Sequence, residues 1–197
     1  MLLRPRKFRI IHEFNKKSTM RSSSIYILIA NTVDLNNQSI LEINSWIQKE
    51  VSKQLKNPHT IENNISIISF NYEAIEIAPL SSIVDFKFPI IDKSTSTELN
   101  FKKTIEFLNN KIEVNSGAMI YWIVSESIFK KLLNSKIRES LAKLKEKVTG
   151  NIVIRIQDLN NFTLSDFNNW AISSFIEDTF ETFIEDMYRN KQNIIAV

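Results

Sequence analysis

The hydrophobic positions of this chain follow two patterns that alternate along most of its length. Continuous apolar runs occur at residues 25–29, 65–70, 119–124 and 152–154. Such runs are typical of strands buried on both faces of a parallel sheet. A short apolar segment at residues 75–78 follows the second run too closely for a crossover helix. We therefore expect it to pair with that run as a hairpin partner.

Between these runs, apolar residues recur every three or four positions, which predicts amphipathic helices. The stripes predict helices over residues 40–55, 101–112 and 126–147, and two more near 164–172 and 175–188. The last of these is acidic as well as amphipathic, and we expect it either to pack against the sheet or to form a docking surface. Its apolar positions are Phe175, Ile176, Phe180, Phe183, Ile184 and Met187.

Strands that alternate with helices predict an α/β protein with three layers: a doubly wound, mostly parallel sheet with helices on both faces. We expect one domain over residues 22–197, preceded by a basic extension over residues 1–21. Ligands of such sheets bind beyond the carboxyl ends of the strands, where the strand order switches. The loops over residues 30–35, after residue 89 and after residue 124 are therefore the ones to inspect.

The composition excludes much common enzymology. Gly117 and Gly150 are the two glycines of the chain, and it has no cysteine. A P-loop, a dinucleotide fingerprint and a nucleophile elbow each need two or more glycines at fixed spacing, which this chain lacks. His12 and His59 lie far apart in polar surroundings, so we expect neither an imidazole metal site nor a Ser-His-Asp relay. We therefore expect no enzymatic activity.

Charge is concentrated at the start of the chain. Residues 1–21 hold seven basic residues and one acidic residue, a net +6, while the whole chain carries +3, so the remainder carries −3. This arm is either a solvated extension or an alternative nucleic-acid contact. Its candidate contact residues are Arg4, Arg6, Lys7, Arg9, Lys16 and Lys17.

The hydrophobic runs are too short for a membrane protein, because a helical span needs about 20 apolar residues. The first residues turn basic at once, without the apolar stretch of a secretory signal. We expect a cytoplasmic protein that makes no membrane contact.

The three loops contain Ala30-Asn31-Thr32-Val33-Asp34-Leu35, Ser94-Thr95-Ser96-Thr97-Glu98-Leu99 and Val124-Ser125-Glu126-Ser127. With these loops the chain resembles a von Willebrand factor A (vWA) domain, and within that family the bacterial tellurium-resistance-associated (TerY-type) group. The resemblance covers about residues 25–175. It implies a doubly wound sheet and a metal-ion-dependent adhesion site. In that family, three loops hold a divalent metal: one contains the motif D-x-S-x-S, the second contributes a threonine, and the third contributes the aspartate of a T-D-G motif. Other segments that carry it are Asn57-Pro58, Ile67-Ile68-Ser69-Phe70, Ala78-Pro79-Leu80, Asp85-Phe86, Phe88-Pro89 and Phe167-Asn168-Asn169-Trp170.

The metal pattern of the family is degenerate here. Ala30 stands where the family has its first aspartate, and a shift of the loop by one residue places apolar side chains on the ligand positions. Because Mg²⁺ requires near-octahedral oxygen ligands, we expect no bound cofactor or metal. If a cation binds, it is weakly held Mg²⁺ or Mn²⁺. The ligands would then be Thr32, Asp34, Thr97 and Glu126.

The resemblance implies a non-enzymatic module that binds protein partners, acting as an adaptor or complex subunit, in a bacterial stress-response or defence setting. Candidate partner-binding residues in the loops are Asn31, Thr32, Asp34, Thr97, Ser125 and Glu126. Two alternatives stay open: nucleic-acid contact through the basic arm, and weak Mg²⁺- or Mn²⁺-dependent partner binding. Among the tryptophans, Trp122 is expected in the core, whereas Trp46 is a candidate for an exposed partner anchor.

Overall fold

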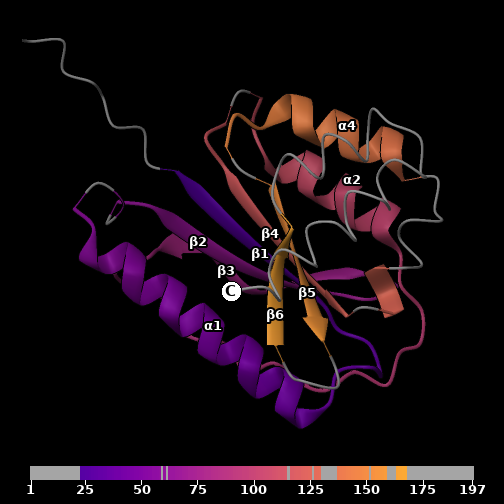
Figure 1. Cartoon of the computed structure of the whole chain (residues 1–197). Coiled ribbons are helices and arrows are strands. Elements are labelled where there is room, and N and C mark those ends of the chain that lie inside the picture. Colours follow the sequence, from indigo (N-terminus) through magenta and orange to yellow (C-terminus); the bar gives the residue numbers. More distant parts are fainter. Residues whose placement is uncertain are drawn as a thin grey trace, which may run out of the picture.

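The computed structural model describes residues 23–58, 60, 62–114, 116–125, 127–129, 137–150, 152–158 and 163–167. The helices and strands whose bounds lie in these residues are β1 (Ser24–Ala30), α1 (Asn37–Lys56), β2 (Asn64–Phe70), β3 (Ala74–Ser82), α2 (Phe101–Lys111), β4 (Met119–Ser125), α4 (Arg138–Lys147), β5 (Ile152–Asp158) and β6 (Thr163–Phe167). Residues 127–129 are helical as well. The strands form one sheet in the order β3-β2-β1-β4-β5-β6 (Figure 1). The four strands β2, β1, β4 and β5 run parallel, and β3 and β6 run antiparallel at the two edges.

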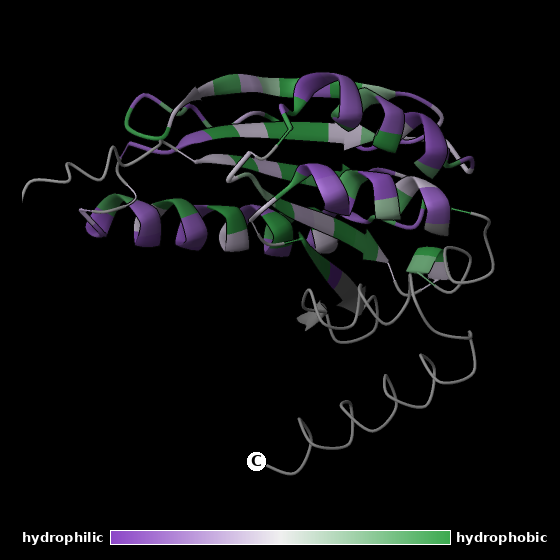
Figure 2. Ribbon diagram, turned by 90° about the horizontal axis from the view of Figure 1, so that it is seen from above, coloured by the Kyte–Doolittle hydropathy of each residue, from purple (hydrophilic) through white to green (hydrophobic). Residues whose placement is uncertain are grey.

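Helices pack on both faces of this sheet, which confirms the predicted fold class. On one face, Ile43, Ile47 and Val51 of α1 join a core with alternate residues of β1, β2 and β4. On the other face, α2 and α4 pack over the remaining alternate residues, with Leu108 and Leu144 fully buried. Figure 2 shows largely apolar strands beside helices that change between apolar and polar around their circumference, as expected when one helix face is buried.

The predicted elements over residues 25–29, 40–55, 65–70, 101–112, 119–124 and 152–154 are confirmed. The hairpin partner is confirmed too, although β3 is longer than residues 75–78 and includes Pro79. Pro79 is exposed on an edge strand, where a proline disrupts the ladder least.

The helix predicted over residues 126–147 is confirmed at residues 127–129 and over α4, but it is not continuous, because residue 137 lies in a turn and α4 begins at Arg138. Ile137 occupies the N-cap position without a side-chain hydrogen bond, and its carbonyl oxygen accepts from Leu141 N. Isoleucine is not a capping residue, so nothing in the sequence marks the start of a new helix here. The apolar periodicity continues across it and therefore predicted a single helix. Residues 130–136 lie outside the described residues.

The helix predicted near residues 164–172 is also wrong at its start, where the structure has β6 antiparallel to β5. Five residues contain too little periodicity to separate a strand from a helix, and pairing with β5 decides the outcome. The helix predicted over 175–188, including its apolar positions, and the basic extension over 1–21 lie outside the described residues.

Trp46 is not the exposed anchor that we expected. Its ring is half-buried and meets Tyr121 edge to face at 5.2 Å, and the Arg155 guanidinium lies over it at 4.4 Å. It therefore helps α1 to cover β4 and β5. Trp122 lies in the core as expected, 3% exposed and stacked on Phe101.

A polar contact joins α2 to the β2–β3 hairpin. The Glu76 carboxylate accepts hydrogen bonds from Lys111 Nζ at 2.6 Å and from Ser66 Oγ at 2.8 Å. Partial burial raises the pKa of Glu76, but the hydrogen bonds from Lys111 and Ser66 outweigh it and hold that pKa below its usual range.

Gly150, just before β5, lies against the backbone that leads into β4. A Cβ atom there would collide with the carbonyl oxygen of Ala118 and approach that of Gly117 to 2.8 Å. Glycine is required at this position by the close approach of two backbone segments.

Candidate functional site

The candidate loops meet where β1 and β4 lie side by side and both strands end. β1 lies between β2 and β4 in the sheet and pairs with both. The chain continues from β1 to β2 on one side and later returns to add β4 on the other side, so the strand order switches between β1 and β4. The connection over residues 83–100, which contains no helix or strand in the structure, returns to the same edge of the sheet.

Asn31, the first residue after β1, fastens that connection in place. Its Nδ2 donates to the carbonyl oxygen of Asp92 at 2.7 Å, and its Oδ1 accepts from Ser94 N at 3.2 Å. The side chain is 7% exposed. Both groups of the Asn31 amide are thus used inside the molecule, and a second link from Val33 N to Ser96 O at 2.9 Å holds the same two loops together.

Asp34 joins the first loop to the end of β4. Its Oδ2 accepts a hydrogen bond of 2.7 Å from Ser127 Oγ and a longer one of 3.4 Å from Ser125 Oγ. The two serine hydroxyls are themselves 3.0 Å apart, and Ser125 Oγ also accepts from Ile128 N. Sequence reasoning missed Ser127, although its position two residues after Ser125 was the available signal.

Thr32 and Thr97 border a cavity of about 390 Å³ between these loops. Thr32 is only 3% exposed, and its hydroxyl has no hydrogen-bond partner among the described residues, whereas Thr97 is exposed. A buried hydroxyl without a partner is uncommon, because its desolvation is uncompensated. The remaining lining comes from Val33, Asp34 and Leu99, from Asn100, Phe101 and Lys102 at the start of α2, and from Ile128 and Ile137.

The described donors fit a divalent cation poorly. Among the described residues that line the cavity, Asp34 carries the single carboxylate, and one of its oxygens already accepts hydrogen bonds from two hydroxyl groups. No group of three or more His, Asp or Glu side chains that could hold a metal occurs in the described part of the chain. Glu126, the remaining candidate ligand, lies outside the described residues. That the chain binds no metal stays a prediction.

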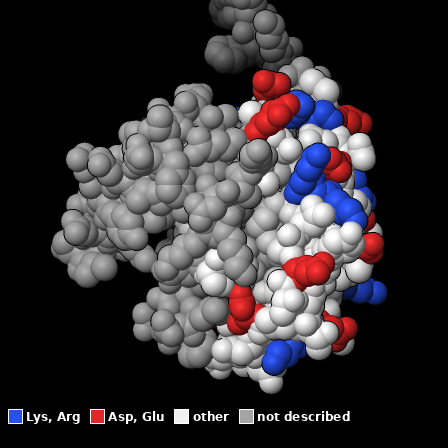
Figure 3. Space-filling view, turned by 90° about the vertical axis from the view of Figure 1, so that its right-hand side faces the viewer, with Lys and Arg blue, Asp and Glu red and all other residues white. Residues whose placement is uncertain are grey.

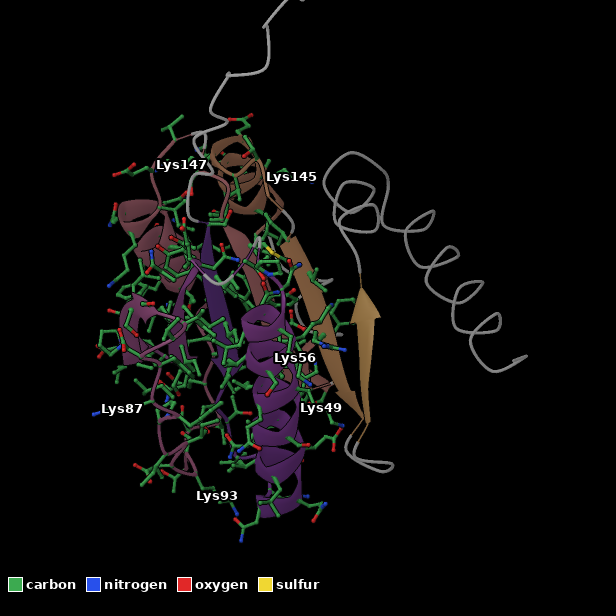
Figure 4. All side chains as sticks on the ribbon, turned by 90° about the vertical axis from the view of Figure 1, so that its left-hand side faces the viewer. Lys49, Lys56, Lys87, Lys93, Lys145 and Lys147 are labelled. Carbon is green, nitrogen blue, oxygen red and sulfur yellow. The ribbon has the colours of Figure 1, made fainter. Side chains whose placement is uncertain are left out.

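On the face that Figure 3 shows, the described charges do not gather into one large patch. Basic and acidic side chains are interspersed on the side shown in Figure 3. The lysines labelled in Figure 4 are spread over α1, the 83–100 connection and α4. The residues proposed for nucleic-acid contact, Arg4, Arg6, Lys7, Arg9, Lys16 and Lys17, lie outside the described residues. Among the helices that the structure describes, none combines the length and apolarity of a transmembrane span.

Comparison with known proteins gives no match in sequence and a distant one in structure. No protein-family model matches the sequence, and no curated protein matches it significantly. Among solved structures, the conserved hypothetical protein BatB from Bacteroides thetaiotaomicron is 10% identical with a TM-score of 0.44, and the match covers 89% of this chain and 100% of that one.

Two further structures are similar at the same level. A von Willebrand factor type A protein from Catenulispora acidiphila is 8% identical with a TM-score of 0.43, covering 82% of this chain and 42% of that one. An aerotolerance-related membrane protein from Bacteroides fragilis, carrying multiple mutations to serines, is 11% identical with a TM-score of 0.40, covering 79% and 86%. The fold class assigned above therefore rests on the strand order and layers of this chain itself.

Proposed function

We propose that this chain is a non-enzymatic, vWA-like interaction module that binds a protein partner through the loops at the carboxyl ends of β1 and β4. The observation that carries the proposal is the direct hydrogen bonding of these loops around a cavity. Asn31 fixes the 92–94 segment, and Asp34 fixes the segment after β4. Loops held in one geometry lose little conformational entropy on binding, which favours a recognition surface.

The chemistry of the described residues favours binding over catalysis. Ser125 and Ser127 both donate to the same oxygen of Asp34, and no histidine or second carboxylate lies within the described lining of the cavity. A serine nucleophile needs a base that is oriented by a third group, and that arrangement is not found in this part of the chain.

The setting that we propose comes from the TerY-type resemblance of the loops. It favours a cytoplasmic adaptor or complex subunit in a bacterial stress-response or defence system. In this proposal the partner is held by loop shape and hydrogen bonds, and its binding needs no Mg²⁺ or Mn²⁺.

Affinity capture from a native lysate of the source organism tests the proposal. The tagged full chain is compared with Thr97→Arg, which places a bulky charged side chain at the exposed rim of the cavity, each with magnesium and with a chelator. Ser52→Arg, on the exposed side of α1, is the control with the same change in charge.

We expect the same partners with magnesium and with chelator, their loss with Thr97→Arg, and their retention with Ser52→Arg. Partners that survive Thr97→Arg would exclude the loop surface. Partners that need no metal themselves and are lost on chelation would instead establish metal-dependent binding.

A further inference from the structure

The face of the sheet on which α1 lies is covered less completely at β5 by the described residues. A parallel strand inside a doubly wound sheet is expected to be buried on both faces. Of the described helices, α1 lies on this face, and the core that it forms is built on β1, β2 and β4. Val153 of β5 is only partly buried at the margin of that core. A further element is therefore needed to cover this side of β5.

Trp46 identifies the side of α1 that faces this area. Its half-buried ring meets Tyr121 of β4 edge to face, and the Arg155 guanidinium of β5 lies over it. An α-helix has 3.6 residues per turn. Lys49 and Lys53, three and seven positions after Trp46, therefore lie on the same side of α1.

Lys49, Lys53 and Lys56 form an exposed row along α1, here called the lysine row, and Figure 4 labels its first and last members. They line a surface groove of about 620 Å³, whose described lining comes from α1 and contains no acidic residue. None of the three forms an ion pair within the described residues. Lysines in the last turn suit the dipole of a helix, but Lys49 lies before that turn. Three uncompensated positive charges favour an acidic occupant.

The chain leaves β6 at the end of α1 that carries Lys56. β6 is antiparallel to β5, and its last residue, Phe167, pairs with Ile154 near the start of β5. Because α1 connects the parallel strands β1 and β2, it runs against them and ends where they begin. β6 also contacts α1 directly. The chain therefore continues from the same edge of the sheet at which α1 ends.

Residues 175–188 have a charge complementary to the lysine row. They contain five acidic residues and no basic residue, and their apolar positions predict a helix. If its apolar stripe lies on the sheet and it runs opposite to α1, such a helix turns Asp178 and Asp186 toward α1. Glu181 and Glu185 then lie on the side away from α1.

The two aspartates also match the lysine row in spacing. Asp178 and Asp186 are eight positions apart, and Lys49 and Lys56 are seven apart. At the rise of an α-helix these intervals correspond to about 12 Å and about 10.5 Å. Antiparallel packing therefore brings Asp178 to Lys56 and Asp186 to Lys49 at the same time.

We infer that the α1 side of β5, bordered by the lysine row, is a docking site for residues 175–188 of the same chain. The segment packs antiparallel to α1, and its apolar stripe covers Trp46 and Val153. The seven residues over 168–174 can span about 24 Å, which exceeds the distance of about 10 Å between the axes of neighbouring helices. This site goes beyond the proposed function and does not rest on it, since the loop surface lies at the carboxyl ends of the strands.

Zero-length cross-linking of the purified full chain locates the segment. A carbodiimide joins a lysine amine to a carboxylate only where the two groups touch. An equal mixture of ¹⁴N- and ¹⁵N-labelled chains separates links within one chain from links between chains. By mass spectrometry we expect links of Lys56 to Asp178 and of Lys49 to Asp186, each within a single chain.

Hydrogen exchange of the 175–188 amides measures how firmly the segment is held. Lys49→Glu should speed this exchange about threefold, and Asp186→Lys should do the same, because an attraction becomes a repulsion. The combined variant should return to within about twofold of the parent chain, since the exchanged charges restore the pair. Glu181→Lys, a similar charge reversal on the side away from α1, should also stay within about twofold.

Links found mainly between chains would overturn the inference and assign the site to a second copy. Absence of links to the lysine row would also overturn it, and unprotected 175–188 amides would then leave the site to an acidic partner from outside the chain. Equal effects of Glu181→Lys and Asp186→Lys would contradict the orientation of the segment. A combined variant that exchanges as fast as the single variants would refute the ion pair on which the docking rests.

Discussion

The unsatisfied hydroxyl of Thr32 predicts that this residue lowers the stability of the fold. Thr32→Val replaces the hydroxyl by a methyl group of nearly the same size, so packing changes little. Leaving a buried hydroxyl without a hydrogen bond costs roughly 1–3 kcal/mol. With Thr32 at 3% exposure, we expect the variant to raise the free energy of unfolding by about 1 kcal/mol.

Thr104 offers a matched control within the same chain. It is fully buried in α2, and its Oγ1 donates to the carbonyl oxygen of Asn100 at 2.9 Å. Thr104→Val removes a satisfied hydrogen bond and leaves stability lower by about 1 kcal/mol. The same chemical change at two buried threonines is therefore expected to have opposite signs.

Equilibrium unfolding in urea, followed by circular dichroism, measures both effects as shifts of the midpoint at constant slope. For a chain of this size, each change corresponds to a shift in Tm of about 2–4 °C. The reasoning about Thr32 is refuted if Thr32→Val destabilises the protein as Thr104→Val does, since its hydroxyl would then have a partner in the folded chain.

Three other features give predictions. Glu76 has a lowered pKa, so its contribution to stability is complete at neutral pH and is lost as the pH falls below about 5. Glu76→Gln should therefore make the urea midpoint less dependent on pH between pH 6 and 3. An unchanged pH dependence would contradict this. Trp46→Ala should destabilise the fold by about 2 kcal/mol, because its ring packs between α1 and the sheet. A variant that is as stable as the parent chain but loses partner binding would show that Trp46 is a partner anchor after all. Gly150→Ala should lower the free energy of unfolding by about 2 kcal/mol or more, because its Cβ would clash with the backbone. Gly117→Ala, whose Cβ would meet a side-chain oxygen at 3.2 Å, should lower it less. Equal urea midpoints for the two variants would exclude the clash.

The layers of the fold were predictable because apolar runs and stripes are local signals. The helix start at Ile137 was not, since a buried isoleucine carries no capping signal. The strand at Thr163–Phe167 was not either, because its identity depends on pairing with β5 rather than on its own five residues.

The candidate site was predictable in its position but not in its contacts. The three loops were located from the strand ends, and Asn31, Thr32, Asp34, Thr97 and Ser125 do meet at one edge of the sheet. What each side chain contacts depends on residues far away in sequence. The partners of Asn31 lie 61 and 63 positions away, and those of Asp34 lie 91 and 93 positions away.

The strand order also bears on when the site forms as the chain folds. The two edge hairpins, β2–β3 and β5–β6, join neighbours in sequence and close short loops, so they can form early. The β1–β4 pairing joins segments separated by both β2–β3 and α2, and it closes a far longer loop. We therefore expect it to be among the last pairings to form. Because the hydrogen bond between Ser127 and Asp34 spans this junction, we expect a half-folded chain to lack the proposed binding surface, and binding of the proposed partner would then report that the domain is complete.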